Sequence, residues 1–123
     1  MRRLSFAVMS VVMGASASAG ADDAELRRGE ALYKAQCSMC HIPHTAVLAP
    51  PLTGLIGRPA GSVRAWRYSE AFRYAEFEWT PEVLDTYIEL PRLMMPGNTM
   101  VYYGMPDAED RAALVRYIET LSD

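Results

Sequence analysis

The sequence contains very little lysine, cysteine and histidine. Lys34 is the only lysine among 12 basic side chains, and there are 2 cysteines and 2 histidines. The formal net charge is −3, and residues 22–123 keep ten basic and fifteen acidic side chains, a net charge of −5. Acidic chains of this kind lack the basic surface that nucleic acids and anionic membranes require, so the composition argues against both partners.

The chain also lacks an N-terminal hydrophobic run long enough to span a bilayer, which takes about 20 apolar residues. Residues 4–13 are apolar apart from two serines, follow the basic pair Arg2 and Arg3, and precede a stretch of Gly, Ala and Ser that ends at Ala21. This order predicts a secretory signal peptide over residues 1–21, cleaved after Ala21 or, as the second choice, after Ala19. An uncleaved membrane anchor is the alternative, and the shortness of the segment argues against it.

Residues 22–123 then make a single small domain with a limited apolar core. No segment shows the alternation of a β-strand, and the helical patterns are separated by long loops at 42–61 and 92–103. We therefore expect an all-α fold of about four helices with ordered loops. Loops of this length in a compact domain usually pack on something, and a bound macrocycle would serve.

Local signals give the helix ends. Acidic Asp22 and Asp23 predict the start of a helix over residues 22–36, and residues 69–74 predict a short one. Thr80 followed by Pro81 predicts a helix that ends near residue 90, because Pro91 disfavours helical geometry before it. Asp107 predicts the cap of a final helix, and its apolar stripe is Leu114, Val115, Tyr117, Ile118 and Leu121.

The most informative motif is Cys37-Ser38-Met39-Cys40-His41. It reads C-x-x-C-H, the signature of covalent haem attachment. Two residues between the thiols let one turn present both sulfurs to the two vinyl groups of one porphyrin, and the adjoining His41 supplies an axial imidazole. Export through a signal peptide agrees with this chemistry, since c-type haem is attached outside the bacterial cytoplasmic membrane.

Two other uses of these residues compete with haem attachment, a redox disulfide and a zinc site. The two cysteines could form a redox disulfide, but the βαβ context of such a motif is missing. With His41 and His44 they could form a zinc site, although neighbouring residues such as Cys40 and His41 rarely bind one metal together.

An iron that transfers electrons without chemistry needs a second axial ligand. The candidates are His44, Met39, Met94, Met95, Met100 and Met105. Met39 lies inside the attachment turn and His44 is too close to His41, so both belong to the same side of the iron. The methionines near residue 100 are favoured, and the loop 96–100 suits a fixed thioether. Met105 remains an alternative to Met100.

The chain resembles the class I c-type cytochromes over residues 26–121. Gly29 and Tyr33 with Leu114 and Tyr117 match the crossing of the first and last helices in that family. The stretch 49–58, the segment Tyr68-Ser69-Glu70-Ala71, and Trp79, Leu84 and Tyr87 fall at family spacing, and 96–100 matches the loop that ends in the ligand methionine.

The resemblance implies a role for each matching residue. His41 would be the proximal and Met100 the distal iron ligand, with Cys37 and Cys40 attached to the haem. The Pro50 carbonyl would bond the second nitrogen of His41, and Tyr87 would lie near the Met100 sulfur. The residues expected near the haem propionates are Arg58, Tyr68, Trp79 and Asn98.

The chain departs from the family in a shorter loop between His41 and Pro50 and in the missing ring of lysines. Arg92, Leu93, Met94, Met95 and Thr99 occupy that region, which predicts an apolar docking patch with Arg92 at its rim. The resemblance implies a monomeric, periplasmic, non-enzymatic electron carrier. Its donor would be a quinol-oxidising complex or a dehydrogenase, and its acceptor an oxidase or a reductase. The alternatives are a haem-c subunit of an oxidoreductase complex and a peroxidase or gas-binding protein with a labile sixth ligand.

Overall fold

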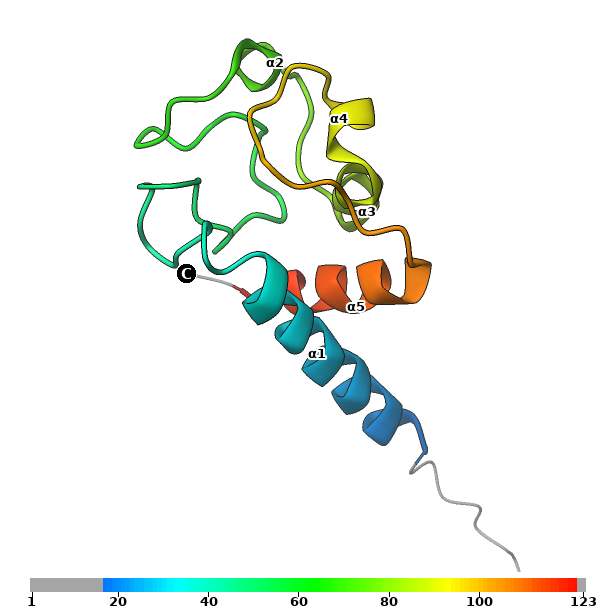
Figure 1. Ribbon diagram of the computed structural model, residues 1–123. Helices are drawn as coiled ribbons and strands as arrows, with labels where there is room; N and C mark the ends of the chain where they lie inside the picture. The colour runs from blue at the N-terminus through cyan, green and yellow to red at the C-terminus, as the bar shows by residue number, and fades with distance from the viewer. Residues whose placement is uncertain (1–16, 122–123) are drawn as a thin grey trace, which may run out of the picture.

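The computed structural model describes residues 17–121, which form a helical fold without a regular strand in that range. The helices follow one another as α1 (Ala17–Gln36), α2 (Glu70–Arg73), α3 (Pro81–Glu89), α4 (Pro91–Met94) and α5 (Ala108–Glu119). In Figure 1, α1 and α5 cross at the base of the molecule, and α2, α3 and α4 lie with the long loops above them. The predicted all-α class is confirmed.

The crossing of α1 and α5 is made possible by the absence of a side chain at Gly29. A Cβ atom at this position would lie 2.0 Å from the Ala113 carbonyl oxygen, so only glycine lets the two backbones approach this closely. One turn further along, the Tyr33 and Tyr117 rings pack at 5.3 Å between centroids. The first and last helices are therefore joined by close backbone packing and by side-chain contacts, which include an ion pair between Arg28 and Asp110.

The second half of the fold is capped as its sequence predicts. The Thr80 side chain accepts a hydrogen bond from the Val83 N–H at 3.2 Å, and Asp107 accepts one from the Asp110 N–H at 2.8 Å. Capping of this kind is typically worth about 1 kcal/mol at each helix. The buried faces of α3 and α5 then meet to form the core, to which they contribute Leu84, Tyr87, Ile88, Leu114, Val115 and Ile118.

Two helix boundaries differ from those predicted. Helix α1 begins at Ala17, so Asp22 and Asp23 lie inside it, because the alanine-rich residues before them are good helix formers. Helix α4 occupies the start of the predicted loop 92–103, and brings the helices to five. Pro91 ended α3 as expected, but proline is also well suited to a first helical position, and here it begins the next helix.

The predicted signal peptide lies mostly outside the described residues, since its first 16 positions are not among them. Within residues 17–121, the helices are all too short or too polar to cross a bilayer.

The loop 42–69 is held by a short backbone pairing rather than by helices of its own. The Gly57 N–H donates to the Trp79 carbonyl at 2.8 Å, the Trp79 N–H donates to the Arg58 carbonyl at 2.9 Å, and an isolated antiparallel bridge joins Pro59 to Glu78. These bonds tie the loop to the segment that directly precedes α3, and residues of the loop and of α3 line one cavity.

Candidate functional site

The C-x-x-C-H motif is a turn that continues directly from α1. The N–H groups of Cys37 and Ser38 both donate to the Tyr33 carbonyl at 2.9 Å, and the His41 N–H donates to the Cys37 carbonyl at 2.9 Å. The Tyr33 hydroxyl donates to the His41 carbonyl at 3.2 Å. Because Tyr33 also packs against Tyr117 of α5, the motif is fixed to the helix crossing.

The orientation of His41 is set by Pro50. The Nδ1 atom lies 2.6 Å from the Pro50 carbonyl oxygen, which can only accept, so Nδ1 carries the proton and Nε2 keeps a free lone pair. Burial lowers the pKa of His41, while the Pro50 contact opposes that shift and the Arg58 charge adds to it. The net result is a neutral imidazole with one nitrogen available to a metal.

The two thiols have different surroundings. Cys37 is partly buried, and burial raises the pKa of its thiol to about 11, whereas Cys40 is exposed. A thiol that ionises with difficulty is poorly suited to disulfide exchange or to zinc binding. No group of three or more His, Cys, Asp and Glu side chains in the described part of the chain could hold a metal ion. Both alternative uses of the cysteines therefore lack support.

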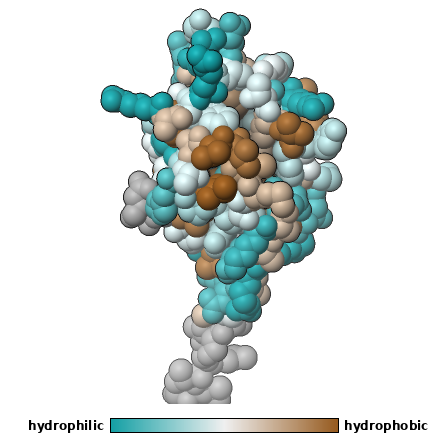
Figure 2. Space-filling view, turned by 60° about the vertical axis from the view of Figure 1, so that its left-hand side comes forward, coloured by the Kyte–Doolittle hydropathy of each residue, from teal (hydrophilic) through white to brown (hydrophobic). Residues whose placement is uncertain are grey.

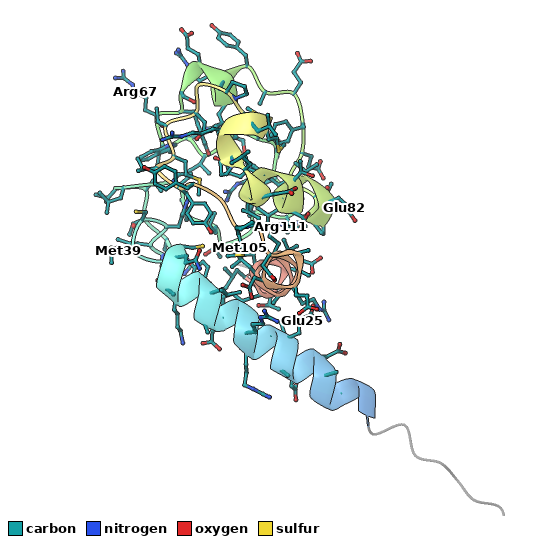
Figure 3. The ribbon with its side chains drawn as sticks, turned by 45° about the vertical axis from the view of Figure 1, so that its right-hand side comes forward. Glu25, Met39, Arg67, Glu82, Met105 and Arg111 are labelled. Atoms are coloured by element: carbon teal, nitrogen blue, oxygen red, sulfur yellow. The ribbon has the colours of Figure 1, made fainter. Side chains whose placement is uncertain are left out.

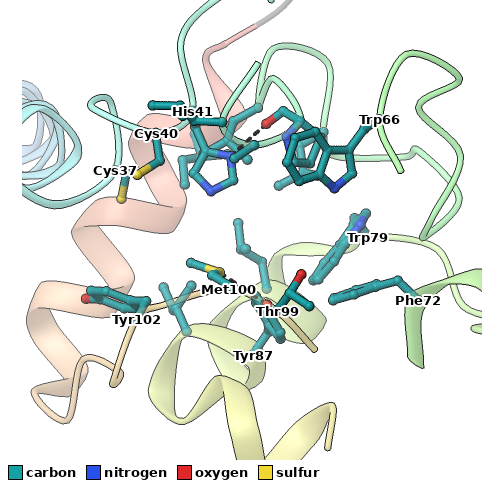
Figure 4. Close-up of a pocket in the computed structure, with 18 of the residues that line it drawn as sticks. Cys37, Cys40, His41, Trp66, Phe72, Trp79, Tyr87, Thr99, Met100 and Tyr102 are labelled. Atoms are coloured by element: carbon teal, nitrogen blue, oxygen red, sulfur yellow. Dashed lines mark hydrogen bonds between the residues drawn. The ribbon is translucent and has the colours of Figure 1, made fainter. Parts of the chain in front are cut away.

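A large apolar cavity opens beside the motif (Figure 4). Its floor is an aromatic cluster in which Trp79 and Tyr87 pack at 5.3 Å between ring centroids and Phe72 packs against Tyr87 at 5.7 Å. Leu55, Leu84 and other apolar side chains from the core complete the wall. Core residues therefore line the cavity directly, and the space that they border suits an apolar group.

Met100 lies on the wall opposite His41 (Figure 4). The Tyr87 hydroxyl lies 3.2 Å from the Met100 Sδ atom, within the range for donation to sulfur, and the Met100 N–H donates to Asn98 Oδ1 at 2.9 Å. An imidazole nitrogen and a thioether sulfur therefore face the same space from two sides.

The other candidate sulfur and nitrogen ligands lie elsewhere. Met105 is buried in the core, 4 % exposed, and does not line the cavity. Met39 is 82 % exposed, His44 is exposed on its loop, and Met94 and Met95 are partly buried against the core without lining the cavity. Among these candidates only Met100 borders the cavity.

The polar residues expected near propionates show two different placements. Arg58, Tyr68 and Trp79 line the cavity as expected, and the Arg58 guanidinium donates to the carbonyls of Thr53 and Pro51 at 3.2 and 2.9 Å. Asn98 does not line it. Its amide nitrogen donates to the carbonyls of Pro91 and Met95, so this side chain organises the loop that carries Met100.

Ser69 is a polar residue of the cavity wall that sequence reasoning did not single out. Its hydroxyl is buried and has no hydrogen-bond partner within the described residues. Buried hydroxyls are almost always bonded, so an unpaired one beside a cavity indicates a polar group of a bound molecule. Its position directly after Tyr68 in the segment that resembles the family was the available signal.

The cavity as a whole has the chemistry that a c-type haem requires. It offers two thiols at one edge, an imidazole nitrogen and a thioether on opposite walls, and aromatic faces. For the carboxylates it offers the Arg58 guanidinium and the Ser69 hydroxyl, which has no partner within the described residues. The residues present therefore fit the group.

Apolar side chains also gather on the surface beside this site. Figure 2 brings forward the side on which the loop 42–69 lies and shows a hydrophobic group at its centre. That loop has three large exposed hydrophobic side chains, Ile42, Val47 and Leu48, and the Met100 loop adds Val101, which is 85 % exposed.

Comparison with known proteins places these observations in a family. Residues 24–118 match the family model described as cytochrome c oxidase, cbb3-type, subunit III. The chain is 40 % identical over 95 residues to cytochrome c2 of Rhodopila globiformis, covering 76 % of this chain and 90 % of that protein. It is 42 % identical over 76 residues to cytochrome c of Trypanosoma brucei brucei, covering 62 % and 82 %.

Another relative is longer than this chain. The c-type cytochrome cy of Rhodobacter capsulatus is 37 % identical over 98 residues, which cover 79 % of this chain and 49 % of that protein, so the chain spans about half the length of this relative. Among solved structures, cytochrome cH from Methylobacterium extorquens superposes with a TM-score of 0.73 at 25 % identity, covering 77 % of this chain and 97 % of that one.

Proposed function

Because the chain belongs to the class I c-type cytochromes and therefore carries one covalently bound haem c, we propose that it is a periplasmic electron carrier with His41 and Met100 as axial ligands. When bound, the haem iron supplies reversible one-electron chemistry between Fe(III) and Fe(II). The main support is the pairing of a deprotonated His41 Nε2 and the Met100 thioether on opposite walls of one cavity. Cys37 and Cys40 would hold the haem through two thioethers.

The protein's part in this function is to hold both ligands still. Pro50 fixes the tautomer and the ring orientation of His41, as partners of metal-bound histidines commonly do. Tyr87 and Asn98 bond the sulfur and the backbone N–H of Met100. Ligands restrained in this way in a packed pocket change little between oxidation states, which favours fast electron transfer.

The polar end of the cavity would receive the propionates. Arg58 would supply the charge, Ser69 a hydroxyl without a partner in the described residues, and Tyr68 and Trp79 further donors, and all four line the cavity. Charge-assisted bonds of a carboxylate to Arg58 would be strong in so apolar a site. A propionate oxygen would also accept a hydrogen bond from the Ser69 hydroxyl, which has no partner within the described residues.

With His41 and Met100 both bound to it, the iron would have no site for a substrate, so no residue is assigned a catalytic role. The test uses the holoprotein in both oxidation states. We expect reversible one-electron titration, no adduct when carbon monoxide is added to the reduced protein, and no turnover of hydrogen peroxide. Rapid binding of carbon monoxide with peroxide turnover would instead identify the peroxidase or gas-binding alternative.

The proposed function includes a location and redox partners for the protein. Residues 1–21 would direct export and be removed after Ala21 or Ala19, leaving residues 22–123 as a monomeric carrier in the periplasm. A quinol-oxidising complex or a dehydrogenase would reduce it, and an oxidase or a reductase would oxidise it. Mass spectrometry of the periplasmic protein tests the cleavage, since retention of residues 1–21 would contradict export by this route.

One observation favours a second candidate, a haem-c subunit within an oxidoreductase complex. The matching family model is described as a subunit of an oxidase. Against it, the chain covers 82–90 % of two relatives that are cytochromes in their own right. Gentle extraction distinguishes the two candidates, because a carrier is recovered free and a subunit is recovered with its complex.

A further inference from the structure

The segment that follows Met100 has few attachments to the rest of the molecule. Among the described residues, the backbone groups of 101–104 make no hydrogen bond, and the next one belongs to the Met105 N–H, which donates to the Ile88 carbonyl at 2.8 Å. Val101 and Tyr103 are exposed, while Tyr102 packs partly against the core. Any displacement of this segment would move Met100 with it.

One side-chain bond crosses from this segment to the opposite side of the cavity. The Tyr102 hydroxyl donates to Gln36 Oε1 at 2.6 Å, across 66 positions of sequence. Gln36 is the last residue of α1 and directly precedes Cys37. Both residues line the cavity, and Figure 4 shows Tyr102 on the Met100 side, facing the end of the molecule where Cys37 lies.

We propose that the Gln36–Tyr102 hydrogen bond is a clasp that ties the Met100 loop to the haem-attachment helix and so keeps Met100 on the iron. The inference rests on the proposed function, since it takes Met100 as the distal ligand. Gln36 and Tyr102 are positioning residues that act through Met100. Both groups are neutral, so loss of the bond changes how often the loop opens without changing the charge around the closed site.

The expected size of the effect follows from the usual net strength of such a bond. A neutral hydrogen bond of this kind changes an equilibrium by about two- to tenfold. If opening of the loop is required before another ligand can reach the iron, the apparent affinity for that ligand rises by the same factor when the clasp is removed.

Imidazole is a suitable probe, because it is neutral and competes directly with Met100. Titration of the oxidised holoprotein with imidazole is followed by the loss of the far-red band that marks a sulfur–iron bond. We expect Tyr102→Phe and Gln36→Ala each to bind imidazole about two- to tenfold more tightly than the wild type. The double variant should match either single one, because both remove the same bond.

Two controls separate the clasp from a general effect of substitution. Tyr103→Phe removes a hydroxyl from the exposed neighbouring residue and should leave the affinity for imidazole unchanged. Gln36→Glu keeps both the bulk of the side chain and an acceptor for the Tyr102 hydroxyl, and should behave as the wild type. Gln36→Met keeps similar bulk without an oxygen acceptor and should bind imidazole as tightly as Gln36→Ala, whereas a purely steric role of Gln36 predicts wild-type affinity for Gln36→Met.

The results that overturn the proposal are distinct from those that overturn the function. Wild-type affinity in both Tyr102→Phe and Gln36→Ala, with the far-red band intact, means that the bond does not position Met100. A wild-type protein that has no far-red band at all removes Met100 as the ligand, and the clasp with it. Equal far-red bands in all variants before imidazole is added would show that the closed site itself is unchanged, as the proposal requires.

Discussion

The imidazole of His41 has one nitrogen bonded to Pro50 and the other directed at the cavity, so its role is set by a loop residue nine positions away. Met100 is fixed in the same manner by Tyr87 and Asn98. At the scale of single residues, the site thus consists of two prospective ligands whose orientation is determined by hydrogen bonds from other parts of the chain.

Attachment at the two cysteines is the first prediction at this scale. Haem should remain with the wild-type protein after denaturation in acid acetone, because two thioether bonds hold it. In Cys37→Ala/Cys40→Ala the haem should be extracted and the chain should be largely unfolded, since so small a core depends on the macrocycle. Ser38→Ala changes the same turn without removing a thiol and should retain haem. Free extraction from the wild type would contradict covalent attachment.

The Tyr87 hydroxyl provides the second prediction. By donating to the Met100 sulfur it withdraws electron density and favours Fe(II), so Tyr87→Phe should lower the reduction potential. A hydrogen bond of about 1 kcal/mol corresponds to a shift of about 40 mV. Redox titration measures this shift, and the far-red band should persist. An unchanged or higher potential would mean that the hydroxyl does not donate to the sulfur in the holoprotein.

At the scale of secondary structure, the crossing of α1 and α5 is the contact that positions the attachment turn. Tyr33 packs in this crossing and also donates a hydrogen bond to the His41 carbonyl, so the position of the attachment turn depends on how the two helices cross (Figure 1). Gly29 is the residue on which the close approach depends.

Gly29→Ala should therefore be strongly destabilising. Alanine is the better helix former by about 1 kcal/mol, yet its Cβ would overlap the Ala113 carbonyl and should cost about 1–3 kcal/mol or more net of that gain. Denaturant unfolding of the holoprotein measures the difference. Ala31→Leu adds bulk at an exposed position of the same helix and should change the unfolding free energy by less than about 0.5 kcal/mol. A stabilised Gly29→Ala variant would show that the helices can separate without cost.

The elements that could be predicted from the sequence are those with local signals. Thr80 and Asp107 accept hydrogen bonds from N–H groups three residues away, so a few neighbouring residues determine where α3 and α5 begin. Helix α4 was missed because a proline that ends one helix can also begin another, and only tertiary packing decides between the two.

The parts of the site that could be predicted are also those with a local signal in the sequence. The motif carries its own chemistry in five consecutive residues, and the contact of Pro50 with His41 was implied by the resemblance to the family. The role of Asn98 differs because its amide is used by the carbonyls of Pro91 and Met95, which sequence does not reveal. The Gln36–Tyr102 bond joins residues 66 positions apart and leaves no periodic or compositional signal.

At the scale of the whole molecule, acidic side chains are kept away from the cavity, which among the described residues is lined by Arg58 and by no Asp or Glu. Residues 31–69 and 90–106, which include the attachment turn and the Met100 loop, contain no Asp or Glu although the chain has 15 acidic residues. In Figure 3, Met39 and Arg67 lie at one side of the molecule and Glu25 and Glu82 at the other. The site thus opens among exposed apolar side chains, and the charged residues on those segments are Lys34 and four arginines.

Docking by this face should depend only weakly on salt. Exposed charges are screened over about 8 Å at physiological ionic strength, and few charges surround the exposed apolar residues. The second-order rate of electron transfer with the native partner should fall only slightly as ionic strength rises. A steep fall would mean that the arginines dominate docking.

In the structure, only one apolar residue of the predicted docking patch at residues 92–95 is exposed. Met94 and Met95 pack partly against the core, whereas Leu93 is 74 % exposed. Leu93→Glu should therefore slow electron transfer markedly and leave the spectrum unchanged. Thr86→Glu adds the same charge at an exposed position of α3 and should react at nearly the wild-type rate. Equal rates in both variants would exclude Leu93 from the docking surface.

The most direct test of the central claim is the far-red absorption of the oxidised holoprotein in two methionine variants. Met100→Ala should lose the sulfur–iron band and open the iron to cyanide, because Met100 is the candidate that borders the cavity opposite His41. Met105→Ala should keep the band and lose about 2–5 kcal/mol of stability, since Met105 is buried in the core. A band retained in Met100→Ala and lost in Met105→Ala would contradict the assignment of the distal ligand.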